Sequence, residues 1–540
     1  MFNMKLVKKI SLITSFFLYV ISILNPAFYL PWSGFLSEYL TFLSLFFLLP
    51  IFFNDSISIP RYSLIFLVIS IIPCIQYNLG LVVYFDTAML SVFYLIAFWL
   101  AILVGFNGAE RYYNSLIFFY WVILLCGLVS SIIAMLQWLH FDLSPDFFMQ
   151  ANSRPSANMA QPNHLSTFLI LSLISCLYFY ESKIINNKIL VIFSIILLVA
   201  ISLTQSRTAW VIFLFLCVYW LIAYKRHILT FNYKKIGLYL SFFIGISILL
   251  PLLKKIFFQQ KTISIVERAS SGYERIQIWL QALEAIKKQP FYGYGWNQSS
   301  FAQFDTIQEG FIKNRLSSFH NIILDIILWC GIPLAICLIF LFSYFIFKYL
   351  IKSYNFTQIC AVSFIITIVI HALLEFPLNY SYFLLPVGFL LGYLFFSFKE
   401  KEIKIKGAIF IFVFLVGFFT SFYIFREYSR IPDNMVAAEQ HEMNEIKDTI
   451  ILPYKMNFFK SFQYRAEWIS LYPCTKMDEK KLNELKYMIK TYMIYYDLLK
   501  FSELLEYNGY TEQSKQYLNK INYIYDKEYT ISDLKCSSAQ

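Results

Sequence analysis

Charged residues are scarce in this sequence, and their scarcity excludes a soluble protein of ordinary composition. Only 14% of the 540 residues are charged, whereas 59% are hydrophobic and 20% are aromatic. Surface-to-volume scaling leaves a soluble chain of this length too little interior to hide so much apolar surface. The composition therefore indicates a membrane protein.

The sequence also lacks the spacings that mark metal and redox sites. No CxxC and no Cys/His ligand spacing occurs, and seven of the nine cysteines lie in or beside apolar segments, as small buried hydrophobes. The other two, Cys474 and Cys536, lie in the C-terminal tail, where their spacing permits a disulfide without showing one. No Asp-x-Asp or Trp-Trp-Asp occurs in the segments expected outside, so we expect no metal and no cofactor. Any reaction that releases an anionic group such as a diphosphate would then have to rely on Arg and Lys for the leaving charge.

Long apolar runs are abundant, and each is long enough to cross ~30 Å of hydrocarbon. The first run follows Lys5, Lys8 and Lys9, as in a signal peptide, but no small-residue cleavage site follows, so we expect an uncleaved span. The sequence predicts an all-α polytopic membrane protein with about 13 transmembrane helices. The predicted spans are 10–30, 35–53, 62–79, 88–106, 115–139, 164–180, 188–204, 208–223, 236–253, 319–347, 356–374, 380–397 and 405–425.

The loops between these spans differ in their Lys and Arg content. With a cytoplasmic N-terminus, the cytoplasmic loops hold 17 Lys and Arg, and the short loops opposite hold only Arg154 and Arg207. We therefore expect two long outer segments, 254–318 and 426–540. The formal net charge of +11 then reflects topology and not nucleic-acid binding. The expected domains are 1–253, an N-terminal transmembrane bundle; 254–318, an outer helical loop; 319–425, C-terminal transmembrane helices; and 426–540, an outer helical domain.

The loop 254–318 carries nine Lys and Arg against five acidic residues, which suggests an anionic ligand or, alternatively, a solvated basic loop beside anionic lipid. Within it, "SSGYERIQIWLQALEAIKKQP" predicts an amphipathic helix whose apolar stripe is Ile276, Trp279, Leu280 and Leu283. The following "FYGYGWNQSSF" is a turn whose rings could stack on sugars or serve only structure.

The tail 426–540 has sixteen basic and seventeen acidic residues and is nearly neutral. Two amphipathic helices joined at Asn508–Gly509 resemble a tetratricopeptide-like hairpin. Such a domain could receive a protein partner or act as a structural cap.

Four polar clusters stand out, because ionisable groups at the ends of membrane helices are costly. The first, "RPSANMAQPNHLSTF", places Arg154, Gln161, Asn163 and His164 before a helix, where free N–H groups favour anions. Helix capping by Asn163 is the alternative. In the second, "LTQSRTAWV", Arg207 offers a planar fork that matches phosphate, or it simply snorkels.

The third cluster, "SSFHNIILD", contains His320, whose side chain suits proton transfer near neutral pH. We expect Asp325 to be a poor orienting partner, because five residues along a helix lie on a different face. Alternatively, His320 is a capping or surface residue.

The fourth cluster is "HALLEFPLNYSYFLLP". It places His371 and Glu375 four apart on one helical face, and Pro377 then delivers Tyr380 and Tyr382 to the next helix. A purely structural His–Glu pair is the alternative.

Together these clusters resemble the O-antigen ligase/polymerase superfamily, which is GT-C-like in fold, and most closely its bacterial protein O-oligosaccharyltransferases of the PglL or pilin-glycosylating type. The first cluster resembles their Arg-Pro-Ser-Gly-Asn-x-x-Gln-Pro-Asn-His signature, with Ala157 where Gly is more usual. The resemblance covers roughly residues 150–400 and continues, in order, through "LTQSRTAWV", "YERIQIWLQAL", "GYGWNQ", "FHNIILD" and "HALLEFPLNYSYFLLP".

The resemblance implies a metal-independent, inverting transfer of glycan from undecaprenyl diphosphate to Ser or Thr of a periplasmic or pilin protein. It implies that Arg207 and Arg275 clamp the diphosphate and that His320 contacts the acceptor hydroxyl. It also implies a bacterial inner-membrane protein with a periplasmic tail. The remaining substrate-binding candidates are Arg154, Gln161, Asn163, His164, His371, Glu375, and Tyr380 or Tyr382, with the choice of tyrosine left open.

Other functions remain compatible with the sequence. An O-antigen ligase would use lipid A core as acceptor, and an O-antigen polymerase another repeat unit, whereas the Gln-Pro-Asn-His stretch and the tail favour a protein. A lipid-linked glycan transporter is disfavoured, because the polar residues gather at one face and do not line a path through the membrane. A glycan-binding assembly factor is a further alternative.

Overall fold

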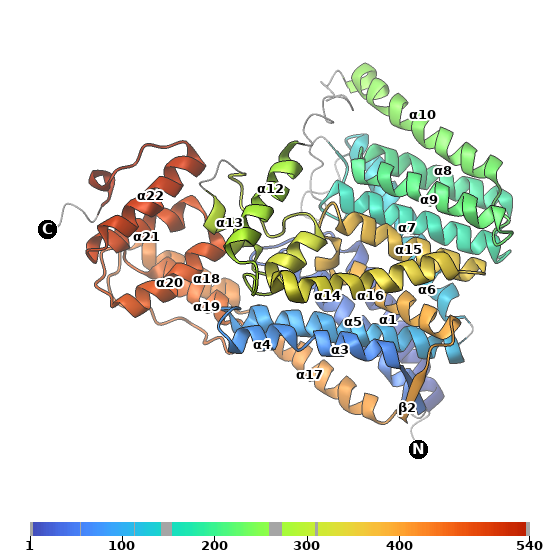
Figure 1. Cartoon of the computed structure of the whole chain (residues 1–540), viewed down its shortest axis with the longest axis horizontal. Helices are drawn as coiled ribbons and strands as arrows, with labels where there is room; N and C mark the ends of the chain where they lie inside the picture. Colours follow the sequence, from blue (N-terminus) through green and yellow to red (C-terminus); the bar gives the residue numbers. More distant parts are fainter. Residues whose placement is uncertain are drawn as a thin grey trace. The chain divides into compact units, whose positions relative to one another are not determined.

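The computed structural model describes residues 4–53, 56–112, 114–141, 154–258, 273–307 and 312–535, which form α-helices with very little strand (Figure 1). Its contacts divide the chain into two compact units. We call the first the bundle unit: Met1–Ile69, Tyr94–Ala269 and Leu341–Ser421. The second is the tail unit: Ser70–Phe93, Ser270–Phe340 and Phe422–Gln540. Each is described by itself.

Ten helical segments of the described chain are long and apolar enough to cross a membrane. They contain α1 (Met4–Leu24), α2 (Phe35–Leu48) with η1 (Leu49–Phe52), η2 (Arg61–Ser63) with α3 (Leu64–Ile69) and α4 (Ile72–Asn78), α5 (Phe85–Arg111), α6 (Ser115–Trp138), α7 (Pro162–Glu181), α9 (Arg207–Lys225), α10 (Tyr233–Phe258), α14 (Ile322–Lys352), and α17 (Ile409–Tyr428) with α18 (Ile431–Met443).

Three shorter apolar helices of 17 residues complete the set: α8 (Asn187–Leu203), α15 (Phe356–Ala372) and α16 (Ser381–Ser397). At 1.5 Å per residue each is about 25 Å long, near the lower limit for a span. Every predicted span overlaps one of these segments, although the bounds differ by several residues at some ends. The prediction of an all-α polytopic membrane protein is therefore confirmed.

Helix α7 lies at the centre of the bundle unit, where it packs against α6, α8, α9 and α15. Small residues allow neighbouring helices to approach closely, as is common in membranes. A Cβ on Gly105 or Gly392 would overlap the backbone of α16 or α5, respectively, and one on Gly127 would overlap Ser172 of α7. Ser172 also donates a hydrogen bond to the Ile123 carbonyl, at 2.9 Å.

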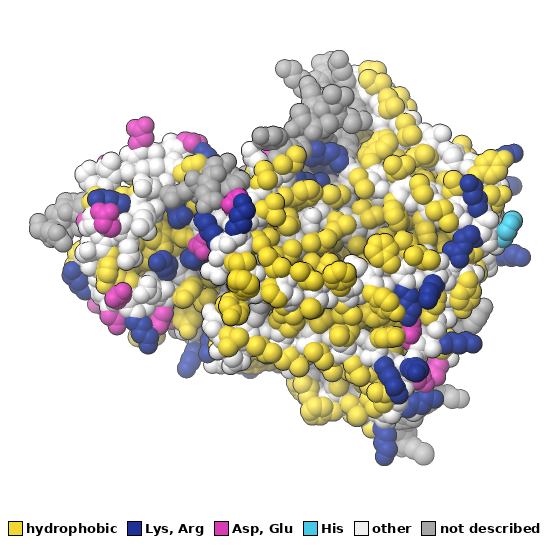
Figure 2. Space-filling model, viewed as in Figure 1, with side chains coloured by type: hydrophobic (Ala, Val, Ile, Leu, Met, Phe, Trp, Pro, Cys, Tyr) yellow, Lys and Arg dark blue, Asp and Glu magenta, His cyan; other side chains and the backbone are white. Residues whose placement is uncertain are grey.

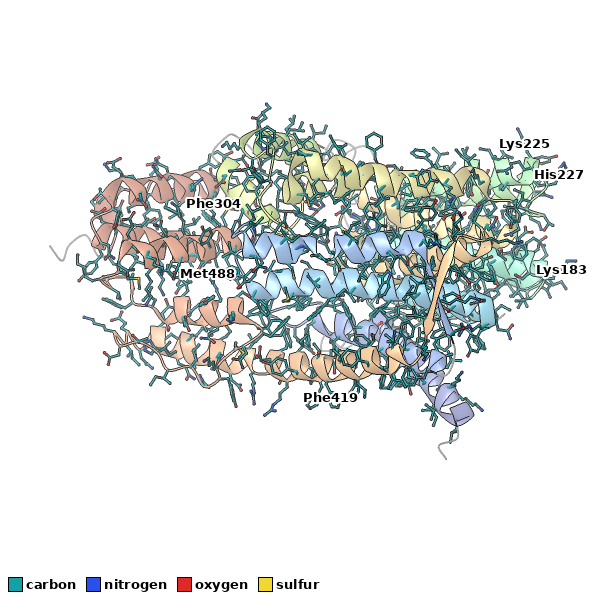
Figure 3. The ribbon with its side chains drawn as sticks, turned by 60° about the horizontal axis from the view of Figure 1, so that its bottom comes forward. Lys183, Lys225, His227, Phe304, Phe419 and Met488 are labelled. Carbon is teal, nitrogen blue, oxygen red and sulfur yellow. The ribbon has the colours of Figure 1, made fainter. Side chains whose placement is uncertain are left out.

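One end of the bundle unit collects the loops that the charge bias assigns to the cytoplasm. There β1 (Ser56–Pro60) and β2 (Glu402–Lys406) pair antiparallel, an unpredicted contact. The Asn107 amide oxygen of α5 accepts the Ser58 N–H at 2.8 Å, which ties β1 to that helix. Figure 3 labels Lys183, Lys225 and His227 at this end. In Figure 2, Lys and Arg gather where β2 lies, whereas hydrophobic side chains cover much of the visible helical surface. We call this the basic end.

The tail unit is built from α19 (Lys460–Ser470), α20 (Glu479–Tyr492), α21 (Tyr495–Tyr507), α22 (Thr511–Tyr525) and η4 (Ile531–Asp533), together with α12 (Tyr273–Lys288) and α13 (Ser299–Thr306). Phe304 of α13 and Met488 of α20 belong to one buried apolar core (Figure 3). The predicted hairpin is confirmed, because α21 and α22 meet at a turn in which Gly509 has φ +84°.

A buried polar network holds the tail helices together. Asp497, fully buried, accepts hydrogen bonds from Arg465 at 2.6 Å and from the Trp468 indole at 2.8 Å. Lys500 donates to the Glu442 carboxylate at 3.1 Å and to the Ile469 carbonyl at 2.7 Å. Burial lowers the pKa of Lys500, and the neighbouring Glu442 carboxylate opposes that shift.

Three cations of the predicted basic loop make hydrogen bonds or ion pairs within the tail unit. Lys313 pairs with Asp526 at 2.5 Å, Arg315 donates to the Thr491 carbonyl at 3.0 Å, and Lys288 donates to the Asp305 carbonyl at 2.7 Å. These contacts give those three cations a structural role, and the attraction of an anionic ligand by the loop stays a prediction. Two other cations of the loop, Lys261 and Arg268, lie outside the described residues.

The predicted apolar stripe of α12 is wrong. Ile276, Leu280 and Leu283 are 51%, 48% and 46% exposed, whereas Ile278 and Ile286 are buried. The buried face also carries small residues, Ala282 and Ala285, which let α12 approach α13 closely. Hydrophobic periodicity identified a helix, but it could not tell which face of that helix is packed.

The turn after α12 packs backbone to backbone against a kink in α14, where Gly331 has φ +74° and Pro333 follows. Tyr294 donates its N–H to the Leu328 carbonyl at 2.6 Å, and Ile332 donates to the Pro290 carbonyl at 2.7 Å. Cβ atoms on Gly293 or Gly331 would overlap the opposing backbone, so these positions require glycine. The structural alternative for this turn is therefore supported, although Phe291 and Tyr292 remain exposed.

Of the cysteines, the seven in or beside apolar segments are free thiols, and Cys474 in the tail is disulfide-bonded. Cys536, the other cysteine of the tail, lies outside the described residues, so a pairing between the two stays a prediction.

Candidate functional site

Opposite the basic end, the bundle unit carries a group of linked polar side chains. Arg154 donates to the Asn163 amide oxygen at 3.2 Å, and Asn163 donates to Glu375 at 3.0 Å. Arg154 also donates to the Thr204 carbonyl at 2.7 Å, which ties in the loop before Arg207. Three of the four predicted clusters therefore meet at this end, which we call the polar end.

Two buried histidines form the centre of the polar end. His164 and His371 are 1% and 0% exposed, and their ring centroids lie 5.3 Å apart in an edge-to-face arrangement. The Tyr380 ring lies 4.7 Å from that of His164. Tyr380 is half-buried, whereas Tyr382 is 7% exposed and packs on Phe383. Of the two tyrosines, Tyr380 is thus the one in contact with the histidine pair and partly accessible.

The capping alternative for Asn163 is wrong. Gln161 is the N-cap residue of α7, without a side-chain capping bond, and Pro162 is the first helical residue. Asn163 lies in the first turn, where its amide bridges Arg154 and Glu375. The Glu375 carboxylate accepts a hydrogen bond from Asn163. The alternative of a purely structural His371–Glu375 pair stays a prediction.

Ala157 occupies a backbone conformation that favours glycine. Its φ is +49°, in the left-handed region, and Ala160 follows with φ +55°. Gln137 of α6 fixes the turn by accepting the Ala157 N–H at 2.7 Å and donating to the Ala157 carbonyl at 3.3 Å. This geometry explains why the motif usually carries Gly at this position. Ala157 in its place strains the backbone of the turn but changes none of the polar side chains of the motif.

Glu38 is a polar-end residue that sequence reasoning missed. It is 3% exposed in α2, and one carboxylate oxygen accepts the Tyr94 hydroxyl at 2.6 Å and the Ser381 N–H at 2.8 Å. Its other oxygen has no hydrogen-bond partner among the described residues. A carboxylate inside a predicted span is costly, and that cost was the signal that could have identified Glu38.

Arg207 is the first residue of α9 and is exposed. A cavity of about 50 Å³ adjoins it, lined by Ser202, Gln205 and Ser247 together with the apolar side chains of Ile201, Trp210 and Phe243. Ser206 caps the helix by accepting the Ala209 N–H at 3.3 Å. A guanidinium at a helix N-terminus, where free N–H groups face outward, is an arrangement suited to an anion.

The His320 loop of the tail unit is held by a buried carboxylate. Asp325, 3% exposed, accepts the Ser299 hydroxyl at 3.0 Å, the Ser318 hydroxyl at 2.5 Å and the Phe319 N–H at 3.0 Å. The Ser318 hydroxyl in turn accepts the His320 N–H at 3.0 Å. His320 itself is half-buried and has φ +55°.

The expectation that Asp325 cannot orient the histidine rested on placing both in one helix, and that placement is wrong. Helix α14 begins at Ile322, after His320. Asn321 is the residue that caps it, accepting the Ile323 N–H at 3.0 Å. His320 is therefore not a cap, and Asp325 fixes the backbone on which its ring is carried.

The sequence-predicted residues thus fall into two groups. The polar end brings together Arg154, Gln161, Asn163, His164, His371, Glu375, Tyr380 and Tyr382, with Arg207 on the adjoining loop. Arg275, half-buried in α12, and His320 belong to the tail unit. Among the described residues, no group of three or more His, Cys, Asp or Glu is arranged to hold a metal ion.

Comparison with known proteins extends along nearly the whole chain. Residues 192–339 match the O-antigen ligase family, and residues 359–532 match the C-terminal region of the virulence factor membrane-bound polymerase family. The chain is 33% identical over 528 residues to a general O-oligosaccharyltransferase of Acinetobacter baylyi, covering 96% of this chain and 92% of that protein. It is 31% identical over 395 residues to a ComP-specific O-oligosaccharyltransferase of the same organism, covering 69% of each.

Proposed function

Because this chain belongs to the protein O-oligosaccharyltransferases of the O-antigen ligase superfamily, we propose that it moves a glycan from undecaprenyl diphosphate to Ser or Thr of periplasmic proteins. Membership makes it a membrane glycosyltransferase of the protein O-oligosaccharyltransferase type, which sets aside the transporter and assembly-factor alternatives. The carrier, the compartment and the chemistry below are the proposal.

The observation that carries the proposal is the His320 loop. A left-handed backbone at a non-glycine residue is strained, and such strain persists where surrounding structure fixes it, often at functional sites. Here a buried carboxylate fixes it with three hydrogen bonds. The imidazole is thereby held outside the helix on a rigid support, as a base or positioning group for a hydroxyl requires.

In the proposed reaction, the acceptor oxygen attacks C1 of the donor sugar as the bond from C1 to the diphosphate oxygen breaks. The proton of the hydroxyl passes to His320, and the single displacement inverts the configuration at C1. Arg207 and Arg275 stabilise the charge that develops on the departing diphosphate, a role for which a guanidinium needs no metal ion.

At the polar end, the linked side chains are proposed to bind the donor head group. Arg154 and Glu375 hold Asn163 between them, which keeps the start of α7 in place. Like Arg154 and Asn163, Gln161 at the N-cap and Tyr380 beside His164 are partly accessible. We propose that these two contact the sugar, with the buried His164, His371 and Tyr382 supporting them.

Orientation in the inner membrane is proposed from charge and redox chemistry. The basic end, with its Lys and Arg, suits the cytoplasm under the positive-inside rule. The disulfide at Cys474 suits an oxidising compartment, so 254–318 and 426–540 are assigned to the periplasm. The four domains 1–253, 254–318, 319–425 and 426–540 follow from that topology.

The acceptor is proposed to be a protein and not lipid A core or another repeat unit. The relative matched over 96% of this chain is named a general O-oligosaccharyltransferase, and the one matched over 69% is named ComP-specific. This favours several periplasmic acceptors, with a pilin among the candidates.

Reconstitution tests the proposal. Purified chain in liposomes receives undecaprenyl-diphosphate oligosaccharide together with a Ser-bearing pilin or with core lipid, and mass spectrometry locates the glycan. We expect glycan on Ser or Thr only, unaffected by chelators. Transfer to core lipid with none to protein would overturn the acceptor assignment.

A matched pair of variants tests the diphosphate role in the same assay. Arg207→Ala removes the arginine at the N-terminus of α9, and Arg226→Ala removes the one at its C-cap, near the basic end. Removing a donor to developing charge costs ~10²–10³-fold in rate. We expect that loss for Arg207→Ala and normal turnover for Arg226→Ala. Equal activities would exclude Arg207 from the reaction.

A further inference from the structure

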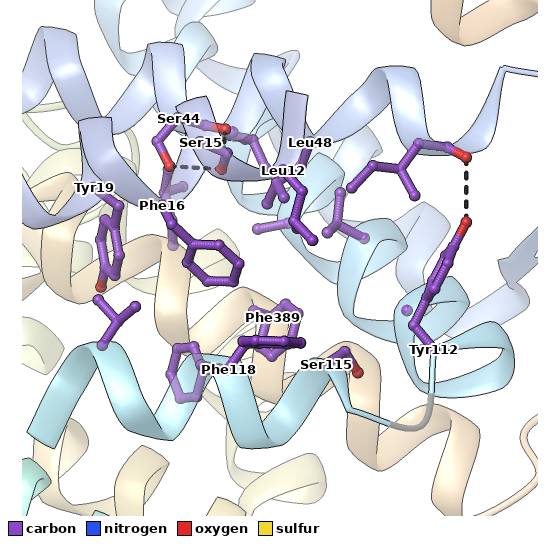
Figure 4. Close-up of a pocket in the computed structure, with 18 of the residues that line it drawn as sticks. Leu12, Ser15, Phe16, Tyr19, Ser44, Leu48, Tyr112, Ser115, Phe118 and Phe389 are labelled. Carbon is purple, nitrogen blue, oxygen red and sulfur yellow. Dashed lines mark hydrogen bonds between the residues drawn. The ribbon is translucent and has the colours of Figure 1, made fainter. Parts of the chain in front are cut away.

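A cavity of about 580 Å³ lies within the bundle unit among α1, α2, α5, α6 and α16 (Figure 4). Leu12, Phe16, Leu48, Phe118 and Phe389 turn toward it, and its walls are almost wholly apolar. Protein interiors are close-packed, and atoms that face a void lose their contacts on one side. The volume lies within the ~300–1,000 Å³ typical of ligand pockets. These features indicate a hydrocarbon occupant.

The cavity opens sideways toward the bilayer. Phe118 lines it and is 46% exposed, so its mouth reaches the outer surface of the bundle unit. The neighbouring face of α1 presents Ile13 and Phe17, which are 58% and 64% exposed. Because α1 and α6 are membrane spans, the medium at this opening is lipid.

One end of the cavity is basic. Toward the other end, the serine hydroxyls that line the cavity are already hydrogen-bonded within the protein. Lys8, Lys9 and Arg111 line the end that lies at the basic end of the bundle unit. Arg111 is held there by its hydrogen bond to the Ser56 carbonyl. Toward the other end, Ser15 donates to the Ser44 carbonyl at 2.8 Å, so these hydroxyls satisfy each other (Figure 4).

The length of the cavity corresponds to one leaflet. Its lining on α1 runs from Lys8 to Tyr19, a rise of about 16 Å at 1.5 Å per residue. That is about half of the ~30 Å hydrocarbon core. A chain that starts at the cationic residues and ends beside Tyr19 would therefore reach the middle of the bilayer.

We propose that this cavity binds one acyl chain of an anionic phospholipid from the leaflet at the basic end, with its phosphate against Lys8, Lys9 and Arg111. The charge argues against the isoprenoid tail of the glycan donor. The three residues form a cationic end of the cavity, in which Arg111 also pairs with Glu110 at 3.7 Å. The proposed function puts the donor's diphosphate at the polar end, so the anion at the basic end belongs to another lipid. This choice of occupant rests on the proposed function.

Thermal unfolding of the full-length purified chain tests the proposal, in detergent with added phosphatidylglycerol or phosphatidylcholine of identical acyl chains. We expect phosphatidylglycerol to raise the midpoint by ~2–4 °C more than phosphatidylcholine, since a ligand stabilises the state it binds. Equal shifts, or displacement of bound phosphatidylglycerol by undecaprenyl phosphate, would overturn it.

A pair of glycine variants tests whether the lipid binds in this cavity. Gly108→Leu fills the cavity from α5, where an added Cβ meets only the Ser115 side chain at 3.7 Å. Its control is Gly245→Leu on α10, where a Cβ meets nothing within 4 Å. We expect the lipid shift to vanish in Gly108→Leu and to persist in Gly245→Leu. Persistence in both would exclude the cavity.

The charge requirement has its own variant, so the proposal stays testable if Gly108→Leu does not fold. In the double variant Lys8→Gln/Lys9→Gln, we expect phosphatidylglycerol and phosphatidylcholine to give equal shifts. A retained preference for phosphatidylglycerol would contradict the assigned head-group position.

Discussion

The histidines of the two units are held in opposite ways. In the bundle unit, His164 and His371 are buried on helices, against each other and the Tyr380 and Phe383 rings. In the tail unit, His320 is half-buried in a loop whose backbone is fixed by Asp325. Packing fixes the first pair at the cost of access. Backbone hydrogen bonds fix His320, and the residue stays partly exposed.

This difference has a consequence for mutagenesis. Changes at the polar end should lower stability together with activity, because the side chains there support one another. Changes at His320 should lower the rate and leave stability nearly intact.

The largest expected effect is that of His320→Ala. General acid–base catalysis contributes ~10²–10⁴-fold, so we expect a loss of that size in glycan transfer, measured by single-turnover assays on the purified chain. The thermal midpoint should stay unchanged. The control is His227→Ala, because His227 also has a left-handed backbone, with φ +57°, but lies at the basic end. A large fall in midpoint for His320→Ala would make its role structural.

Next in size is the effect of Asp325→Asn, which keeps the shape and removes the charge that accepts from Ser299, Ser318 and Phe319. A small misplacement of a reacting group can cost ~10²-fold, and we expect at most that, in kcat more than in KM. In a His320→Ala background the same change should have little further effect on rate. If the two substitutions together lowered the rate by the product of their separate effects, Asp325 would not act through His320, and a positioning role would be contradicted.

At the polar end, Asn163→Ala removes the link between Arg154 and Glu375. An unsatisfied buried group costs about 1–3 kcal/mol, so we expect a lower thermal midpoint in addition to slower transfer. Asn379→Ala, at an exposed position in η3 (Pro377–Asn379), is the matched control and should change neither. If Asn163→Ala slowed transfer without lowering the thermal midpoint, the polar end would respond to substitution in the same way as His320, and the difference drawn between the two regions would be wrong.

The smallest expected effect is that of Ala157→Gly. A left-handed backbone at a non-glycine residue destabilises the folded state by roughly 1–2 kcal/mol, and glycine removes this strain. Glycine also makes the unfolded chain more flexible, which offsets part of the gain. We therefore expect a thermal midpoint equal to or slightly above that of the native chain. Ala200→Gly, within α8 with ordinary helical geometry, should lower it. If both variants lose stability equally, the Ala157 turn is not strained.

Sequence patterns predicted the membrane helices well because length and hydropathy determine them. They also selected Arg154, Asn163 and Glu375 before anything showed that the three are linked. They could not predict that link, the Glu38 carboxylate's position or the packed face of α12, because each depends on contacts between distant segments. The error about Asp325 has the same origin, since a helix that begins three residues later than predicted changes which groups face each other.

The kink of α14 bears on how the chain is made. A helix broken at Gly331 and Pro333 leaves backbone groups that hydrocarbon cannot satisfy. Their partners, at Pro290 and Tyr294, are completed by the ribosome first. The partners of the kink therefore already exist when α14 is made, and the broken helix does not rely on lipid to satisfy its backbone.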